Sequence, residues 1–378
     1  MTLLCDFSFI RPTYTSFQQQ TLDWLYQAHL EAEKSKGRKD PSFSEEILAK
    51  NFANVTCNPS LLATRGHMVP DYLHTNWEEM QVYNVRKNPE AAPLSLRSIY
   101  FEQYADEIFA RYYPLPSSPP DDLIHVTCTG YVSPSGAQKI VSKHQWGFYT
   151  TVTHAYHMGC NAAIPAIRMG MGFLAAFSDK NRADIVHTEV CSLHTHPADH
   201  RLDQLVCQSL FADGFIKYSL KKQTDQPHFR ILAVHEEIVS DSIQSMLWKV
   251  GSFGFEMTLL KEVPVFLVRK ISSFLEVLAK KSGKTASFLK DNALFAIHPG
   301  GPKILSYLQK ELCLEEKQME KSLSLFKKYG NMSSATLPHV WEEILSDEMV
   351  GHKTPIVSFA FGPGLNIVGI IMEKICGS

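Results

Sequence analysis

The chain has 378 residues, of which 44% are hydrophobic and 20% charged, and 37 basic against 39 acidic side chains give a formal charge of -2. This composition excludes a disordered, collagen-like or coiled-coil chain, and at roughly 150 residues per domain the length predicts about two domains. The balanced charge argues against a dedicated binder of nucleic acid or anionic membranes, since such proteins carry a surplus of Lys and Arg.

The eight cysteines are spread along the chain, and none forms a C-x-x-C pair. Cysteines scattered in this way predict reduced, mostly buried thiols in a cytoplasmic protein. The N-terminal stretch, Met1–Pro12, has Asp6 inside its apolar run and no basic segment, so we expect no signal peptide. The uncharged stretches 144–167 and 354–372 are interrupted by Gly159 and by Gly362-Pro363-Gly364, so we expect no membrane span.

The first third of the chain has the texture of helices. Apolar residues at helical spacing predict a helix over Thr15–Lys34, and we expect two more over Ser44–Phe52 and Phe101–Tyr112. The Pro- and Ser-rich segment 114–122 then marks a connection to a different kind of structure.

From Leu123 onward, short strand-like runs alternate with helix-like runs, which indicates a sheet covered by helices. The predicted strands are Leu123–Cys128, Tyr149–Ala155 and Asp184–Cys191, and the predicted helices are Gly136–His144, Cys160–Phe177 and Leu202–Leu210.

The alternation then runs a second time. The predicted strands are Phe229–Val234, Ala293–Ile297 and a hairpin of Pro355–Phe361 with Leu365–Met372, and the predicted helices are Val263–Lys280, Pro302–Leu312 and Glu316–Tyr329. This repetition predicts an α/β protein made of two similar halves, residues 1–219 and 220–378.

The segment His157–Ile164 places Cys160 where a strand ends, Gly159 permits a tight turn, and a helix begins. The positive end of a helix dipole lowers the pKa of a thiol, which would make Cys160 a nucleophile. The alternative is that Cys160 is one more buried thiol.

Two further polar residues lie in turns flanked by glycine. His298 follows a predicted strand in the string AIHPGGP, and Asn331 follows a predicted helix in the string KYGNMSS. A lone histidine is usually structural. Asn331-x-Ser also resembles a glycosylation sequon, but nothing directs the chain to the secretory pathway.

Together these segments resemble the type III polyketide synthases, the chalcone and stilbene synthase superfamily. The matching strings are YHMGCNAA (156–163), QSLFADG (208–214), IHPGGPKIL (297–305), YGNMSSA (329–335) and FGPGL (361–365). They stand in the family's order and approximate spacing over most of the chain. The string EVCSL (189–193) is closer to the bacterial alkylresorcinol and alkylpyrone branch than to the plant chalcone branch.

The resemblance implies a thiolase-like αβαβα fold, a homodimer and an acyltransferase. Cys160 would take an acyl starter from a thioester, and His298 would hold the Cys160 thiolate as an ion pair. His298 and Asn331 would then donate hydrogen bonds to the carbonyl of a malonyl thioester during decarboxylation and Claisen condensation. Cyclisation would give a pyrone or resorcinol. No cofactor is implied beyond the thioester substrates.

The resemblance also implies a substrate pocket. Phe211 would stand between the coenzyme A tunnel and the pocket, with Met257 as a second gate, and His194, Cys128 and Ser133 would line the pocket. Ser133 lies near the position from which plant enzymes insert a side chain into the partner's pocket. The series His194, His196 and His200 invites a zinc reading, but no carboxylate or cysteine completes a site, so we predict no metal.

The source of the thioester is open in the sequence. Residues 51–60, where plant relatives carry the cations that bind coenzyme A, have none, and only Lys50 is nearby. Either the cations come from elsewhere, or the acyl groups arrive on an acyl carrier protein.

Three other functions are compatible with the same residues. A ketosynthase of this fold would join two preformed acyl or β-ketoacyl thioesters into a pyrone. A Cys/His thioester hydrolase would use Asn331 to orient His298. A binding protein without catalysis would leave Cys160 unreactive, and it is the weakest alternative because all three reactive residue types are present.

Overall fold

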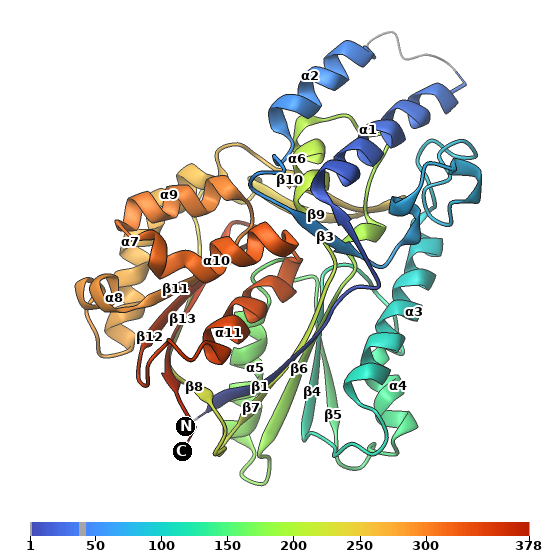
Figure 1. Cartoon of the computed structure of the whole chain (residues 1–378). Coiled ribbons are helices and arrows are strands. Elements are labelled where there is room, and N and C mark those ends of the chain that lie inside the picture. Colours follow the sequence, from blue (N-terminus) through green and yellow to red (C-terminus); the bar gives the residue numbers. More distant parts are fainter. Residues whose placement is uncertain (1, 38–42, 378) are drawn as a thin grey trace.

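The computed structural model describes residues 2–37 and 43–377, and a large mixed sheet dominates it (Figure 1). Its strands follow the order β11-β12-β13-β8-β1-β7-β6-β4-β5. The strands have these bounds: β1 (Leu3–Ile10), β2 (Tyr14–Phe17), β3 (Thr64–His67), β4 (Asp122–Thr127), β5 (Thr151–Tyr156), β6 (Arg182–Glu189), β7 (Gly214–Lys221), β8 (His228–Ile238), β9 (Met246–Gly251), β10 (Gly254–Leu259), β11 (Leu294–Ile297), β12 (Pro355–Gly362) and β13 (Asn366–Ile375).

Two short antiparallel pairs, β2 with β3 and β9 with β10, lie outside the large sheet. The helices have these bounds: α1 (Gln18–Ser35), α2 (Glu45–Val55), α3 (Leu94–Tyr112), α4 (Gly136–Lys143), α5 (Ala163–Ala176), α6 (Leu202–Leu210), α7 (Val263–Lys281), α8 (Ala286–Asn292), α9 (Pro302–Leu312), α10 (Glu316–Tyr329) and α11 (Thr336–Ser346). Across the described ranges, none of the helices combines the length and hydrophobicity needed to cross a bilayer.

The large sheet consists of two parts that meet at a narrow junction. Strands β1 and β8 pair through Leu3 with Arg230 and Leu4 with Phe229 alone, whereas the other neighbouring strands pair over longer stretches. One part, β5-β4-β6-β7-β1, is built from residues before 222, and the other, β8-β13-β12-β11, from residues after 227. The division of the chain at residue 219 stays a prediction about domains.

Helices cover the two parts of the sheet in three layers. Residues of α5 and α11 share one buried apolar cluster with strands of both parts, so these helices lie between them. The outer layers are α3 and α4 over one part and α7, α8 and α9 over the other, each with its own cluster (Figure 1). The order of layers is therefore αβαβα. It explains why β4, buried along its whole length, has no polar alternation.

Most predicted elements from Leu123 onward are confirmed, with ends that differ by a few residues. The helical interpretation of the N-terminus is wrong for its first residues, because β1 and β2 precede α1. A bulge in β1, with Asp6 in the left-handed region (φ 55°), breaks the strand alternation and hides it from pattern analysis. The helix predicted from Cys160 begins instead at Ala163.

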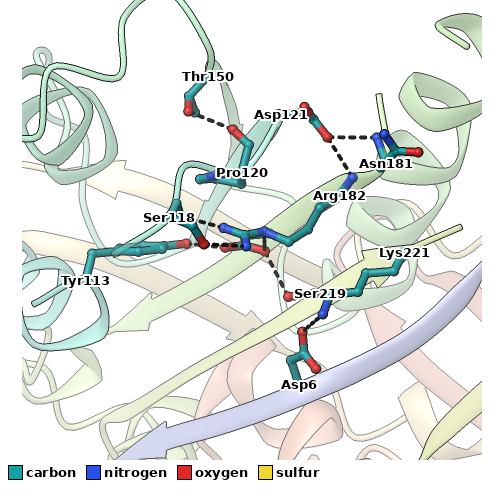
Figure 2. Close-up of polar contacts among 11 residues, drawn as sticks. Asp6, Tyr113, Ser118, Pro120, Asp121, Thr150, Asn181, Arg182, Ser219 and Lys221 are labelled. Carbon is teal, nitrogen blue, oxygen red and sulfur yellow. Dashed lines mark hydrogen bonds and ion pairs between the residues drawn. The ribbon is translucent and has the colours of Figure 1, made fainter. Parts of the chain in front are cut away.

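A polar cluster ties together the amino ends of β4 and β6, on the side of the molecule drawn in Figure 2. Asp184 is buried and accepts hydrogen bonds from the hydroxyls of Tyr113 (2.9 Å) and Ser219 (2.8 Å). The Arg182 guanidinium lies 3.1 Å from the same carboxylate, as an ion pair. Asp121, just before β4, accepts from the N–H of Arg182 (2.8 Å), so the starts of the two strands are tied together and the site described next lies at their other ends.

Candidate active site

A cavity lies at the carboxyl ends of β4 and β6, the side of an α/β sheet where ligands usually bind. The volume of the cavity is about 60 Å³. Its walls combine aromatic side chains with four thiols, those of Cys128, Cys160, Cys191 and Cys207. Four of the eight cysteines therefore face one space.

Cys160 is presented by a tight turn between β5 and α5. His157 and Gly159 both have positive φ angles, 59° and 87°. A Cβ on Gly159 would lie 2.2 Å from Cδ of Pro363, so only glycine fits there. The thiol ends up in the turn that precedes α5, where it faces the cavity.

Burial raises the pKa of Cys160 to about 12, while hydrogen bonds from Ser333 and Asn331 act in the opposite direction. The Ser333 hydroxyl lies 3.8 Å from Sγ. The prediction of a lowered pKa is therefore wrong for this structure, because the cost of burying the thiolate exceeds the help from the helix end. Burial raises the pKa values of Cys128 and Cys191 even further above the usual range.

His298 follows β11 and is 2% exposed. Its backbone N–H donates to the carbonyl of Phe359 (2.8 Å), which fixes it to β12. Burial lowers the pKa of the imidazole to about 3, so the ring is neutral, with one N–H and one lone pair. Neither ring nitrogen has a hydrogen-bond partner in residues 2–37 and 43–377. The ring of His298 is therefore free to bond a group that enters from outside the fold.

Asn331 follows α10, after Gly330 with a φ of 75°. Its Oδ1 accepts from the N–H of Ser333 (2.9 Å), which directs Nδ2 toward the carbonyl of Gly300 at 3.3 Å. The N–H of Gly300 in turn donates to the carbonyl of His298 (2.9 Å). The turns that carry His298 and Asn331 therefore meet at Gly300.

The structure thus assembles a thiol, a neutral imidazole and an amide from three separate elements. Cys160 and His298 are not hydrogen-bonded to each other within the described ranges, and burial keeps each neutral. An ion pair requires that both charges form side by side, since either charge alone is destabilised by burial. The predicted ion pair stays a prediction.

The predicted pocket residues divide into two groups. Phe211, Met257, His194 and Cys128 line the cavity, whereas Ser133 is exposed in the loop before α4. Ser133 therefore does not line the pocket of its own chain, because that loop points outward.

Phe211 lies beside the reactive residues through its backbone. The N–H of Ala212 donates to the carbonyl of Asn331 (2.8 Å), and the N–H of Asn331 donates to the carbonyl of Leu210 (3.0 Å). The segment that carries Phe211 is thus fixed directly to the turn that carries Asn331.

His194 is committed to the backbone. Its Nδ1 accepts from the N–H of Phe255 (3.0 Å), so its Nε2 carries the proton and donates to the carbonyl of Thr129 (2.8 Å). Burial lowers its pKa to about 3. Both nitrogens are therefore in use. In the described residues no group of three His, Cys, Asp or Glu has the geometry to hold a metal ion.

Sequence analysis missed Trp248 and Phe255, which line the cavity from the hairpin β9–β10. It also gave no role to Glu189, a buried carboxylate that accepts from the N–H of Cys128 and the hydroxyls of Thr129 and Ser334. The alternation in WKVGSFGFEM could have indicated the hairpin, because Gly251 and Gly254 flank a two-residue turn.

Residues 230–376 match the family described as "Chalcone and stilbene synthases, C-terminal domain". Over 259 residues the chain is 29% identical to "Probable polyketide synthase 1" of Dictyostelium discoideum, a match that covers 67% of this chain and 8% of that protein. The C-terminal part of the chain is thus similar to the chalcone and stilbene synthases. The family assignment from the sequence is confirmed, while the placement near its bacterial branch stays a prediction.

Solved structures of polyketide synthases share the fold at low identity. The brown-algal PKS-I of Ectocarpus siliculosus has a TM-score of 0.83 at 21% identity, with 99% of this chain and 98% of that chain covered. The tetrahydroxynaphthalene synthase of Streptomyces coelicolor has a TM-score of 0.80 at 21% identity, with 99% of this chain and 100% of that chain covered. The C-terminal domain of Steely1 from Dictyostelium gives 0.79 at 20%, with 99% of each chain covered. The thiolase-like fold is thereby confirmed.

Proposed function

We propose that this chain is a type III polyketide synthase that carries its acyl starter on Cys160 and extends it with malonyl units. The observation that carries the proposal is the pair of unused nitrogens on His298, whose turn meets the turn of Asn331 at Gly300, next to a cavity lined by Cys160 and Ser333. A neutral imidazole and an amide are hydrogen-bond donors for a thioester oxygen, and the imidazole of His298 is not used by the fold.

The reaction needs charge stabilisation more than it needs a base. The Cys160 sulfur attacks the starter thioester, releases its thiol carrier and becomes acylated. Loss of CO2 from a malonyl thioester then leaves an enolate, whose negative oxygen would be held by His298 and Asn331. The enolate carbon attacks the acyl carbonyl, a carbon–carbon bond forms, and the Cys160 sulfur leaves as thiolate. Exclusion of water by the bound acyl chain would protect the enolate from protonation.

The cavity favours a short starter. Trp248 and Phe255 form part of one wall, and the volume of the cavity is about 60 Å³. Each further methylene needs room as well as apolar contact, so a long alkyl chain would have to displace this wall. Replacing Trp248 with Ala should therefore raise the preference for starters two carbons longer, by about tenfold at roughly 0.8 kcal/mol per methylene. We expect a pyrone or resorcinol product, the ring types named by the family resemblance.

A homodimer would cover the edge of the large sheet at β5. This strand is the last in the order, so one side of its backbone is unpaired. Phe148 (93% exposed) and Tyr149 (63%) precede it, and Ser135 bonds to His154 on it at 2.9 Å. Ser133 lies two residues from Ser135, on this same face. If a second copy of the chain docked at this edge, Ser133 of one subunit would lie near the cavity of the other.

Delivery of the acyl group by a carrier protein remains a second route. Residues 51–60 contain no cation, and Arg65, the charged side chain that lines the cavity, is buried and bonded to the carbonyls of Gln208 and Phe211. Steely1 is named as a hybrid of type I and type III polyketide synthases. A carrier-bound substrate would need no phosphate clamp.

Intact-mass measurement of the purified protein tests the proposal. A panel of acyl groups, each attached to coenzyme A and to a carrier protein, should give a mass increase that maps to Cys160, followed by a new product when malonyl thioester is added. If only a β-ketoacyl thioester yields product, the chain is instead a ketosynthase that joins preformed chains. If no panel member acylates Cys160, the nucleophile assignment is wrong.

The hydrolase alternative receives less support from the geometry. In a nucleophile–base–orienter triad, Asn331 would accept from a ring nitrogen of His298. That hydrogen bond does not occur in the described part of the chain, since both ring nitrogens are unpaired and Oδ1 of Asn331 is bonded to the N–H of Ser333. Release of free acid without a carbon–carbon bond would reverse this judgement.

A further inference from the structure

The hairpin β9–β10 stands apart from the large sheet, yet it bonds directly to the turn that presents Cys160 and also to Cys128, whose sulfur accepts from that turn. It contributes Trp248 and Phe255 to the cavity wall. The carbonyl of Trp248 receives one bond, and its indole N–H makes the other. One residue of the wall is therefore tied twice to the nucleophile's surroundings.

The first bond joins the hairpin to His157. Nε2 of His157 lies 2.9 Å from the carbonyl of Trp248, and a carbonyl only accepts, so Nε2 carries the proton. Its Nδ1 is then a bare lone pair, and it has no partner in the residues that the structure describes. The ring also packs against Tyr131 and Phe255, with ring centroids 5.2 and 5.6 Å away.

The second bond reaches the turn indirectly, through Cys128. The indole N–H of Trp248 donates to the carbonyl of Cys128 (2.6 Å). The sulfur of Cys128 accepts from the N–H of Gly159 (3.0 Å), the residue directly before Cys160. Both paths from Trp248 therefore end within three residues of the reactive thiol.

The turn needs an external hold because its backbone is strained. His157 has a φ of 59°, which is uncommon for a residue with a side chain and persists only where the surroundings enforce it. Its backbone N–H donates to the carbonyl of Thr127 (2.8 Å), at the end of β4. The side-chain bond to Trp248 supplies the second anchor.

We infer that His157 is a positioning residue that couples the hairpin wall to Cys160. Trp248 faces the cavity, so a chain that fills the cavity presses on the same residue that holds the turn. The occupancy of the pocket then affects the reactivity of the thiol. The role of Cys160 as nucleophile rests on the proposed function, but the coupling itself is measurable without any polyketide substrate.

Alkylation of Cys160 by iodoacetamide at pH 8.5, followed peptide by peptide by mass spectrometry, tests the coupling. His157→Phe keeps the aromatic packing and removes the donor, and it should slow alkylation of Cys160 by about fivefold, the loss expected for one neutral hydrogen bond. His157→Gln places an amide N–H near the position of Nε2 and should restore the rate. His144→Phe is the matched control, because His144 makes the same imidazole–carbonyl bond, to Tyr113 at 2.9 Å, away from the cavity.

Hydrogen exchange on the wild-type protein supplies a second measurement that needs no variant. Because coupling is reciprocal, alkylation of Cys160 should change exchange of residues 246–259 in the hairpin. The same alkylation in His157→Phe should leave that exchange closer to its starting value.

The outcomes separate the two proposals. If wild-type Cys160 is alkylated no faster than Cys207, the nucleophile assignment fails. If Cys160 reacts preferentially but at the same rate in His157→Phe as in the wild type, the coupling is wrong while the proposed function stands. The same conclusion follows if alkylation leaves the hydrogen exchange of the hairpin unchanged. A slow His157→Gln would also overturn it, since the donor would then not be what matters.

Discussion

The two ends of strands β4 and β6 use buried polar groups in opposite ways. At the amino ends, Asp184 accepts from two hydroxyls and pairs with Arg182. Beyond the carboxyl end of β11, the His298 ring has no partner in the described residues, and Nδ2 of Asn331 donates to the carbonyl of Gly300 at 3.3 Å. The polar cluster at the amino ends thus serves the fold, whereas the ring of His298 on the other side keeps both nitrogens unpaired.

This difference shows where the protein accepts a cost in stability. A buried donor without a partner costs about 1–3 kcal/mol, so a fold selected for stability alone would pair it. The cluster around Asp184 pairs its groups, and the cavity does not. The comparison predicts that substitutions at the two ends will affect different measurements.

The largest expected effect is the loss of covalent chemistry in Cys160→Ala. Without the sulfur no acyl-enzyme forms, so the mass increase on exposure to acyl thioester should disappear completely. Cys207→Ala is the matched control, because Cys207 lines the same cavity, and it should still be acylated. Intact-mass spectrometry reads both variants, and an undiminished adduct on Cys160→Ala would place the nucleophile elsewhere.

Asn331→Ala should separate loading from condensation. It removes one of the two donors proposed for the enolate oxygen, which typically lowers the rate about 100- to 1000-fold. Acylation of Cys160 should persist, since the thiol remains. Single-turnover release of CO2 from malonyl thioester measures the step. Asn292→Ala is the control, because the side chain of Asn292 bonds only the carbonyl of Phe288 at an exposed site. Equal rates in the two variants would contradict the assigned role.

Asp184→Ala should do the reverse at the other end of the strands. It leaves the hydroxyls of Tyr113 and Ser219 and the guanidinium of Arg182 without their shared acceptor, so the free energy of unfolding should fall by about 3 kcal/mol. Turnover of the folded fraction should be unchanged. Denaturant titration measures the loss, with exposed Asp23→Ala as control. If Asp184→Ala lost activity but kept the wild-type free energy of unfolding, the claim that this cluster serves the fold alone would be contradicted.

Much of the framework could be predicted from the sequence because its signals are local. The apolar run of β4 and the Gly-Pro-Gly turn between β12 and β13 show in the residues themselves. The strings around Cys160, His298 and Asn331 pointed to the residues that the proposed function uses. These features depend on neighbours in the chain, and the structure contains them with small shifts of their ends.

The rest depends on contacts between distant segments. The pKa of Cys160 follows from burial, which the residues around it in the chain do not reveal. The part played by Trp248 follows from its bonds to Cys128 and His157, about 120 and 91 residues away in the chain. The outward position of Ser133 follows from the path of its loop. Pattern and propensity carry no information about such pairings.

The smallest expected effect concerns the charge of His298, and it bears directly on the proposed ion pair. Burial lowers its pKa to about 3 in the folded state, against 6.5 for an unperturbed histidine. The unfolded state therefore takes up the proton first as the pH falls. The stabilising effect of the neutral ring is complete above pH 6.5 and declines by about 1.4 kcal/mol per pH unit below it.

Comparison of the wild type with His298→Gln isolates this effect, because the other buried histidines contribute equally to both proteins. The difference in free energy of unfolding should shift in favour of the variant by about 2 kcal/mol between pH 6.5 and 5. Exposed His74→Gln serves as the control. A difference that stays constant with pH would mean that folding leaves the pKa of His298 unchanged, and a shift in favour of the wild type would mean that His298 already holds its proton at neutral pH. A protonated His298 is what the ion pair with Cys160 requires. The measurement therefore decides whether the proton passes from Cys160 to His298 in the free protein or only once substrate has bound.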